Sequence, residues 1–432
     1  MKFLKKAQKA ILVLMTTLMV AICVPFNSIK AVETKNDTNQ DLKLDVKGAI
    51  AIDEKTGQVL FEQNATEALP VASLSKLLTL YIVLDEIKAG KLSWDQKITP
   101  DKTTAEISQD TSLSNVPLRT DKQYTVKSLY EATLIYSANG AAMALAQAVA
   151  GSQSKFVDMM RKQVKKFGIK DAEIYTCNGL NNEQMKSAAY PGAAKDAENN
   201  FSAKDMAIIS MKLLHKYPEV LKTASVQKKD FDNGNGQTVM ENWNWMLPGQ
   251  SSSYELLPVD GLKTGTSDAA GACFVGTVNK DGHRLITVVL GAQHNSDTDN
   301  SRFVQTQKLM SYVYNTYNYV TLDKGQEKAS LPVYHGKEEK VKVQSDQAVG
   351  IWLKKGTSKK DITAKAVANK KLTKDGALEA PLKKGQTVGK IKLEVSGKTI
   401  KTVSSDIELN AQTTTAVKKA NIFEIIYRSI FK

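Results

Sequence analysis

The alternation of apolar and polar residues predicts a helical middle flanked by strands. Residues 48–62 contain an apolar run, a turn at Lys55 to Gly57 and a second apolar run, which is typical of a β-hairpin. Residues 73–88 are apolar on most faces of a helical projection, so we expect a buried central helix there. Helical spacing predicts further helices at 126–137, 141–150, 155–167 and 203–216.

Strand-like runs return towards residue 318. Residues 272–278 and 284–290 are apolar, and the turn-forming segment Lys-Asp-Gly at 280–282 lies between them. Residues 301–317 have the spacing of a last helix. Strands at both ends of a helical middle indicate an α+β domain with an antiparallel sheet, which we place at residues 32–318.

The pattern changes after residue 319. Short runs in which apolar and polar residues alternate are separated by glycine-containing turns, so residues 319–412 are predicted to form a small, all-β sandwich domain.

The last segment, 413–432, has the pattern of an amphipathic helix. Ile422, Phe423, Ile426 and Ile430 share one helical face, and polar residues lie opposite. Such a basic helix at a chain end is typical of an interfacial membrane anchor. The alternative is a helix docked on the protein itself.

The N-terminus has the order of a secretory signal peptide. Lysines are followed by an apolar run over residues 10–24 and by Pro25. We therefore place a signal peptide at 1–31 and expect an exported protein. The apolar run is short for a membrane-spanning helix, although an uncleaved N-terminal anchor is an alternative.

The net charge of +14 over 432 residues is concentrated at the ends of the chain. Residues 32–318 carry a net charge of −2, residues 319–412 of +8 and residues 413–432 of +3. A nucleic-acid-binding protein would carry a basic patch on its main domain, so this distribution argues against that class. It favours a C-terminal part that faces an anionic membrane surface.

The cysteines and histidines indicate neither a disulfide framework nor a metal site. Beyond Cys23 in the predicted signal, only Cys177 and Cys273 are present, and we expect two small buried residues, although the pattern leaves pairing open. The four histidines are scattered without metal-ligand spacing.

Ser73 and Lys76 open the predicted central helix. Residues three apart share a helix face, so the Ser73 hydroxyl and the Lys76 amine can meet. A serine hydroxyl needs a base to act as a nucleophile, and a lysine can be that base if burial and nearby positive charge lower its pKa. Alone, this motif is a weak signal because Ser-x-x-Lys often occurs by chance.

Two further motifs follow. Ser137 and Asn139 end a helical stretch, where they could relay a proton and hold a substrate amide; a capped helix end is the alternative. Lys-Thr-Gly-Thr at 263–266 precedes a predicted strand, and its glycine would leave room for a peptide along the strand edge. The lysine and threonine hydroxyls would then meet a substrate carboxylate; an exposed polar strand is the alternative.

The three motifs occur in the order found in penicillin-recognising serine enzymes. The sequence resembles the low-molecular-mass penicillin-binding proteins, specifically the serine-type D-alanyl-D-alanine carboxypeptidases. The resemblance extends roughly over residues 45–315, and its supporting segments are 49–53, 72–79, 201–207 and 263–273. The small β domain and the terminal helix are similar to the same family's layout.

The resemblance implies roles for individual residues. Ser73 would be the acylated nucleophile and Lys76 its base, and Ser137 with Lys263 would carry a proton to the leaving amine. The backbone N–H groups of Ser73 and Thr266 would form the oxyanion hole. The substrate-binding residues would be Asn139, which binds the peptide, Arg302, which contacts the terminal carboxylate, and the strand residues Lys263, Thr264, Gly265 and Thr266.

Two departures from the family pattern concern the rim of the site. Residues 175–180 read Tyr-Thr-Cys-Asn-Gly-Leu, where the family usually has Asn-Pro before Gly-Leu, and the loop 182–200 is extended. They make the substrate preference harder to predict than the reaction.

The implied activity is removal of the terminal D-Ala from D-Ala-D-Ala stem pentapeptides of peptidoglycan through an acyl-enzyme, without a metal or cofactor. Penicillins would acylate Ser73. One alternative is a β-lactamase of the same superfamily, although no Glu-x-x-Leu-Asn loop lies between Ser137 and Lys263. The other is a non-catalytic wall-binding scaffold, which would be free to lose the motif residues.

Overall fold

A computed structural model describes residues 42–404 and 407–431; the predicted signal peptide lies outside them. A five-stranded antiparallel sheet forms the centre of the larger domain. Its order is β2 (Val59–Gln63), β1 (Gly48–Asp53), β11 (His283–Ala292), β10 (Gly271–Lys280) and β9 (Val259–Ser267). The α+β fold with an antiparallel sheet is thus confirmed.

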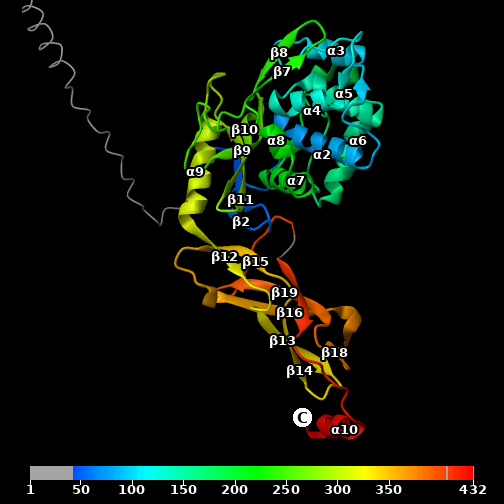
Figure 1. Ribbon diagram of the computed structural model, residues 1–432, viewed down its shortest axis with the longest axis vertical. Helices are drawn as coiled ribbons and strands as arrows, with labels where there is room; N and C mark the ends of the chain where they lie inside the picture. Colours follow the sequence, from blue (N-terminus) through cyan, green and yellow to red (C-terminus); the bar gives the residue numbers. More distant parts are fainter. Residues whose placement is uncertain (1–41, 405–406, 432) are drawn as a thin grey trace, which may run out of the picture. The chain divides into compact units, whose positions relative to one another are not determined.

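Helices cover both faces of this sheet (Figure 1). Helix α9 (Ser301–Thr316) packs on β10 and β11 from one side, and α7 (Ala203–Lys216) packs on β1 and β11 from the other. Because both faces are covered, β1 is buried along its whole length. This burial explains why its sequence is a continuous apolar run.

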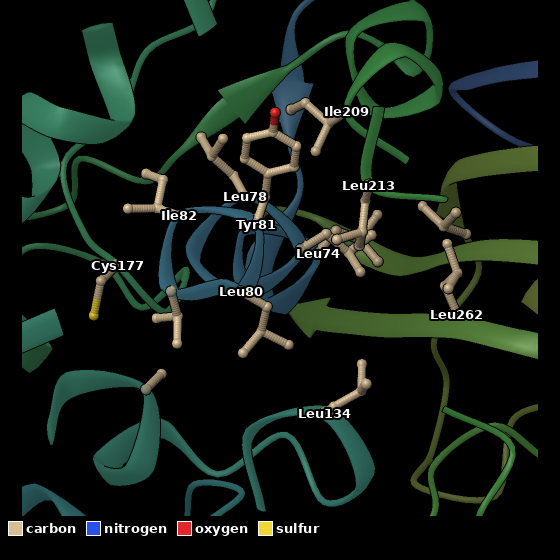
Figure 2. Packing of buried hydrophobic residues seen from close by; sticks show 14 of the residues in the cluster. Leu74, Leu78, Leu80, Tyr81, Ile82, Leu134, Cys177, Ile209, Leu213 and Leu262 are labelled. Carbon is tan, nitrogen blue, oxygen red and sulfur yellow. The ribbon is translucent and has the colours of Figure 1, made fainter. Parts of the chain in front are cut away.

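Helix α2 (Lys76–Lys88) lies in the middle of the helical lobe. Figure 2 shows its apolar side chains leaving on several sides, with Leu78 and Tyr81 opposite Leu80. The predicted helix 73–88 starts later than expected, because a 3₁₀ turn, η1 (Ala72–Ser75), precedes it.

Polar side chains cap several of the other helices of this domain. Thr125 caps the helix that leads to the second motif, and Ser202 with Asp205 forms a capping box at the start of α7. Besides α2, α7 and α9, this domain contains α3 (Lys102–Ser108), α4 (Val126–Ile135), α5 (Asn139–Ala150), α6 (Gln153–Lys166), η2 (Glu183–Ala188) and α8 (Val220–Ala224).

Three small antiparallel pairs complete the domain. They are β3 (Leu69–Pro70) with β6 (Asn200–Phe201), β4 (Lys97–Ile98) with β5 (Tyr124–Thr125), and β7 (Lys228–Asp232) with β8 (Gln237–Glu241). The first pair matters most for the site, because β3 leads directly into η1 and β6 ends the extended loop.

The C-terminal part is all-β, as predicted. Two strands, β12 (Tyr317–Leu322) and β15 (Val349–Lys354), pair with each other, and the others form an eight-stranded sheet with one parallel pair, β13 with β18. The sheet comprises β13 (Lys328–Tyr334), β14 (Lys340–Ser345), β16 (Ile362–Ala368), β17 (Thr373–Lys374), β18 (Ala377–Glu379), β19 (Thr387–Val395), β20 (Lys398–Thr399) and β21 (Glu408–Thr413). Short 3₁₀ turns η3 (Lys359–Asp361) and η4 (Lys370–Leu372) connect strands.

The chain leaves the β domain later than the predicted boundary at residue 412. Val417 is buried and forms an isolated antiparallel β-bridge with Leu382, and the N–H of Ala420 donates to the carbonyl of His335. The terminal helix α10 begins only at Ile422 and ends at Phe431. Residues 413–420 therefore belong to the packing of the β domain.

Helix α10 contacts the β domain through its polar side. The Arg428 guanidinium donates to the carbonyls of Gly336 and Lys337, whereas Phe423 and Ile430 are 80% and 66% exposed. Of the described residues, no helix is both long and apolar enough to cross a bilayer.

Candidate active site

The Ser73 hydroxyl sits on a tight turn between β3 and α2. Ala72 has a positive φ of 47°, which costs energy for a residue with a side chain, and the Ser75 hydroxyl donates to its carbonyl at 2.8 Å. Ser73 is half-buried, whereas the two residues that follow it, Leu74 and Ser75, are buried. The turn therefore presents one hydroxyl to the outside of a packed segment.

Two glycines press against this turn. A Cβ on Gly179 would overlap the carbonyl of Ala72, and a Cβ on Gly265 would lie 2.6 Å from the carbonyl oxygen of Val71. The missing side chain of Gly265 thus makes room for the Ser73 turn. The predicted space for a substrate peptide at this glycine is therefore taken up by the turn, because a Cβ here would point at Val71 and Leu74.

Lys76 is fully buried and has three oxygen partners. Its Nζ lies 2.7 Å from Ser73 Oγ, 2.8 Å from Asn139 Oδ1 and 2.7 Å from the carbonyl oxygen of Asn178. The last two atoms can only accept hydrogen bonds. A neutral amine has two N–H bonds and one lone pair, so it can donate to both and still accept the proton of Ser73.

The surroundings of Lys76 favour this neutral form. Burial lowers its pKa well below the ordinary value, the positive charge of Lys263 lowers it further, and Cys177 opposes weakly. Burial, followed by the charge of Arg302, also lowers the pKa of Lys263 to about 7. The charge of Arg302 thus acts on Lys263, and that of Lys263 acts on Lys76.

Ser137 and Asn139 lie where α4 gives way to α5. Ser137 is buried and has a positive φ of 61°, which marks a sharp reversal of the chain. The Asn139 side chain accepts from Lys76 and donates from Nδ2 to the carbonyl of Ser114 at 3.1 Å. Within the described residues, no hydrogen bond joins the Ser137 hydroxyl to Lys76 or Lys263.

Strand β9 carries the third motif along the edge of the sheet. Lys263 is buried and its Nζ donates to the carbonyl of Thr264 at 3.0 Å, whereas the Thr266 side chain is exposed. Strand β9 packs against η1, so these residues border the Ser73 turn.

Arg302, on α9, reaches the same strand. Its guanidinium donates to the carbonyls of Gly265 (2.9 Å) and Cys273 (3.3 Å) and to the Thr266 hydroxyl (2.8 Å). Its Nε is buried and has no partner among the described residues. The Arg302 guanidinium therefore holds β9 in place. Of the residues that it contacts, Thr266 has an exposed side chain.

Comparison with known proteins identifies this arrangement. Residues 34–294 match the family of D-alanyl-D-alanine carboxypeptidases, and residues 318–419 match the C-terminal domain of penicillin-binding protein 5. The chain belongs to the D-alanyl-D-alanine carboxypeptidase family. This serine-type carboxypeptidase is a low-molecular-mass penicillin-binding protein, as the sequence motifs predicted.

Its relatives match over most of their length. The D-alanyl-D-alanine carboxypeptidase DacC of Escherichia coli is 32% identical over 83% of this chain and 82% of its own. DacF of Bacillus subtilis is 28% identical over 83% and 84%.

Solved structures agree with the fold. The peptidoglycan synthesis regulatory factor PBP3 of Streptococcus pneumoniae is 32% identical, covers 87% of this chain and 100% of its own, and has a TM-score of 0.70. Penicillin-binding protein D2 of Listeria monocytogenes, in a cefotaxime-bound form, is 32% identical over 64% of this chain and 99% of its own, with a TM-score of 0.52.

Several residues of the carboxypeptidase site were not singled out from its sequence. Asn178 supplies a carbonyl to Lys76, and the buried amide of Asn199 hydrogen-bonds Ser75. The indole N–H of Trp243 donates to the carbonyl of Tyr136, directly before Ser137, at 3.1 Å. The segments 175–180 and 182–200 were expected at the rim of the site, but no signal distinguished Asn178 or Asn199 within them, and none pointed to Trp243.

Within the described residues, Cys177 and Cys273 are free and buried, as expected. Among the residues that the structure describes, no group of three or more His, Cys, Asp or Glu side chains is placed to hold a metal ion.

Proposed function

We propose that this carboxypeptidase removes the terminal D-Ala from D-Ala-D-Ala stem pentapeptides of peptidoglycan, with Ser73 as nucleophile and Lys76 as base. The contact that supports this most directly is the 2.7 Å approach of Lys76 Nζ to Ser73 Oγ, combined with two acceptor oxygens on the same nitrogen. Serine activation by a neutral amine needs this arrangement.

In the proposed acylation step, Ser73 Oγ attacks the carbonyl carbon of the penultimate D-Ala and its proton passes to Lys76. The N–H groups of Ser73 and Thr266 would stabilise the negative charge on the carbonyl oxygen. The bond to the terminal D-Ala then breaks, and its amine takes a proton through Ser137 and Lys263. Water afterwards hydrolyses the ester on Ser73.

The carboxylate of the terminal D-Ala would lie beside Lys263, Thr264 and Thr266. Lys263 supplies positive charge there, and Arg302 would act through Thr266 or, after a small rearrangement, with its unpartnered Nε. Asn139, which already bonds Lys76, would hold the peptide on the opposite side of the site.

We further propose that penicillins acylate Ser73. Structures of the Listeria relative are described as cefotaxime-bound and ampicillin-bound forms, which supports β-lactam binding by this fold. A β-lactamase remains the competing proposal at the level of chemistry, because it differs only in how fast water removes the acyl group. The absence of a Glu-x-x-Leu-Asn loop from the sequence favours slow release.

For localisation, we propose an exported enzyme held at the outer face of the cytoplasmic membrane by α10. The exposed apolar side chains of this helix, Phe423, Tyr427 and Phe431 among them, and the basic residues Lys418 and Lys419 before it support peripheral binding to anionic lipid.

Replacing the proposed nucleophile tests the core of this proposal. Ser73→Ala should abolish labelling by a fluorescent penicillin while the protein stays folded, because removing a half-buried hydroxyl costs about 1 kcal/mol or less. The matched control is Ser154→Ala, which removes the hydroxyl of another half-buried serine at the start of α6, outside the Ser73 turn, and should still be labelled. A covalent adduct on Ser73→Ala would move the nucleophile elsewhere, with Ser75 as the next candidate.

A further inference from the structure

The end of the extended loop joins the two segments that carry the proposed oxyanion-hole N–H groups. Ser73 lies on η1 and Thr266 lies on β9, so the gap between their N–H groups depends on how these segments are held apart. Glu198 contacts the β9 side and Asn199, its neighbour in the chain, contacts the η1 side.

Asn199 is fully buried and uses its whole side chain. Its Nδ2 donates to Ser75 Oγ (2.9 Å) and to the carbonyl of Thr176 (2.8 Å), and its Oδ1 accepts from the N–H groups of Tyr175 and Thr176. Its backbone carbonyl accepts from the N–H of Val71 at 3.2 Å. Asn199 therefore fixes the turn around Ser73 from two positions, one before it and one after it.

Glu198 is half-buried and faces the other way. Its carboxylate accepts from the Ser267 hydroxyl at 2.8 Å, and Ser267 Oγ in turn accepts from the N–H of Ala270. Ser267 is the last residue of β9 and directly follows Thr266. The carboxylate thus holds the strand end one residue from the second N–H group.

We propose that Glu198 and Asn199 form a brace that sets the spacing of the oxyanion hole. The brace is a pair of positioning residues: neither touches the reacting atoms, and each acts through a serine, Ser267 or Ser75. This inference rests on the proposed function, because it presupposes that the N–H groups of Ser73 and Thr266 bind the oxyanion. Stabilisation of an oxyanion requires donors at fixed positions, and a displacement of about 1 Å can cost a large part of the rate.

Cutting the brace on its exposed side gives the cleanest test. Glu198→Ala should lower kcat/KM for a D-Ala-D-Ala peptide, and the second-order rate of penicillin acylation, by about tenfold, which is less than the loss of a whole oxyanion-hole donor. The loss should appear in kcat, with KM within about twofold, because substrate binding does not use the brace. Glu198→Gln should retain near-normal activity, since its amide oxygen can still accept from Ser267.

A carboxylate on the same loop provides the matched control. Glu183 pairs with Lys195 in solvent at 3.1 Å, away from both serines, so Glu183→Ala should leave both rates unchanged. An N-acylated D-alanine analogue with a boronic acid in place of the carboxyl group forms a tetrahedral adduct that places an oxygen in the oxyanion hole. Its binding should weaken about tenfold in Glu198→Ala and stay unchanged in Glu183→Ala.

Ser267→Ala removes the same link from the strand side and tests the brace even if Glu198→Ala unfolds. The double variant Glu198→Ala, Ser267→Ala should lose no more activity than Ser267→Ala alone, because Ser267→Ala already removes the contact with Glu198 together with that to the N–H of Ala270. Wild-type rates and boronate binding in folded Glu198→Ala or Ser267→Ala would overturn the brace and leave the proposed function standing. If the wild-type protein itself neither releases D-Ala nor reacts with penicillin, both the proposed function and the brace are wrong.

Discussion

At the scale of single residues, the charge of Lys263 decides how the site depends on pH. In the proposed mechanism Lys76 must be neutral to accept the Ser73 proton, and burial with the nearby positive charge of Lys263 favours that form. In that mechanism Lys263 must keep its proton to attract the carboxylate of the terminal D-Ala, yet its own pKa is lowered to about 7. Because the two amines interact, their titrations are coupled.

This coupling predicts a bell-shaped profile of kcat/KM against pH. Activity should fall at low pH as Lys76 gains a proton, and it should also fall above about pH 7 as Lys263 loses one. The Lys263→Arg variant keeps a positive charge at position 263 at every working pH. The fall of kcat/KM at high pH should therefore disappear, even if the maximum rate drops. An alkaline limb of unchanged position in Lys263→Arg, measured on a D-Ala-D-Ala peptide, would remove Lys263 from this role.

The motif residues were the part of the site that the sequence could predict. Ser73 and Lys76 lie three apart, so local geometry alone brings them together. Asn178, by contrast, lies 102 positions from Lys76 in the sequence, and its carbonyl meets Lys76 only in the fold. Such a contact comes from the backbone carbonyl of a loop, and no pattern of side chains specifies it.

At the scale of elements, the Ser73 turn is clamped by two glycines. Gly179 has a φ of +84° and approaches the Ala72 carbonyl so closely that a side chain would overlap it. Gly168 has nearly the same backbone conformation, with a φ of +83°, but a Cβ there would meet nothing within 4 Å. The two positions therefore separate backbone strain from contact with the turn.

Alanine substitutions at these two glycines should behave differently. Gly168→Ala should lower the free energy of unfolding by about 1–2 kcal/mol, the cost of positive φ, and leave penicillin acylation unchanged. Gly179→Ala should cost more and slow acylation at least tenfold, because the Ser73 turn must move. Thermal unfolding and acylation rates check both, and equal acylation rates in the two variants would show that the turn is not clamped there.

Helix and strand boundaries were predictable where apolar periodicity is strong. The helix Ala203–Lys216 was predicted with the bounds that the structure has, because a serine cap and an apolar stripe define it. The start of α2 was not, since the strained Ala72 conformation depends on Ser75, Gly179 and Asn199, which come together only in the fold. Local sequence cannot encode a turn that distant segments hold in place.

At the scale of the whole molecule, the proposed anchor and the β domain are separable at residue 421. Val417 and Ala420 pack in the β domain, so a truncation after residue 410 would remove part of β21 and these contacts as well. A truncation after Asn421 removes α10 alone. The boundary predicted at residue 412 leaves these contacts out, because apolar and polar residues alternate too weakly over residues 413–420 to predict a further strand.

The truncated protein tests the membrane proposal. Full-length protein should float with anionic vesicles and the truncation after Asn421 should not, since about 1.5–3 kcal/mol per buried large apolar side chain is lost with the helix. The net charge of +8 on residues 319–412 should add an attraction that salt screens. Equal flotation of both proteins would assign α10 to packing on the β domain. Turnover of a soluble peptide should be the same for both.

Mass spectrometry of a stem pentapeptide incubated with the protein tests the central claim most directly. The account predicts that the wild-type protein shortens a peptide ending in D-Ala-D-Ala by one D-Ala residue, and that Ser73→Ala leaves it intact. A control peptide ending in L-Ala-L-Ala should not be cleaved. An intact D-Ala-D-Ala peptide after prolonged incubation with folded wild-type protein, or cleavage that persists in Ser73→Ala, would contradict it.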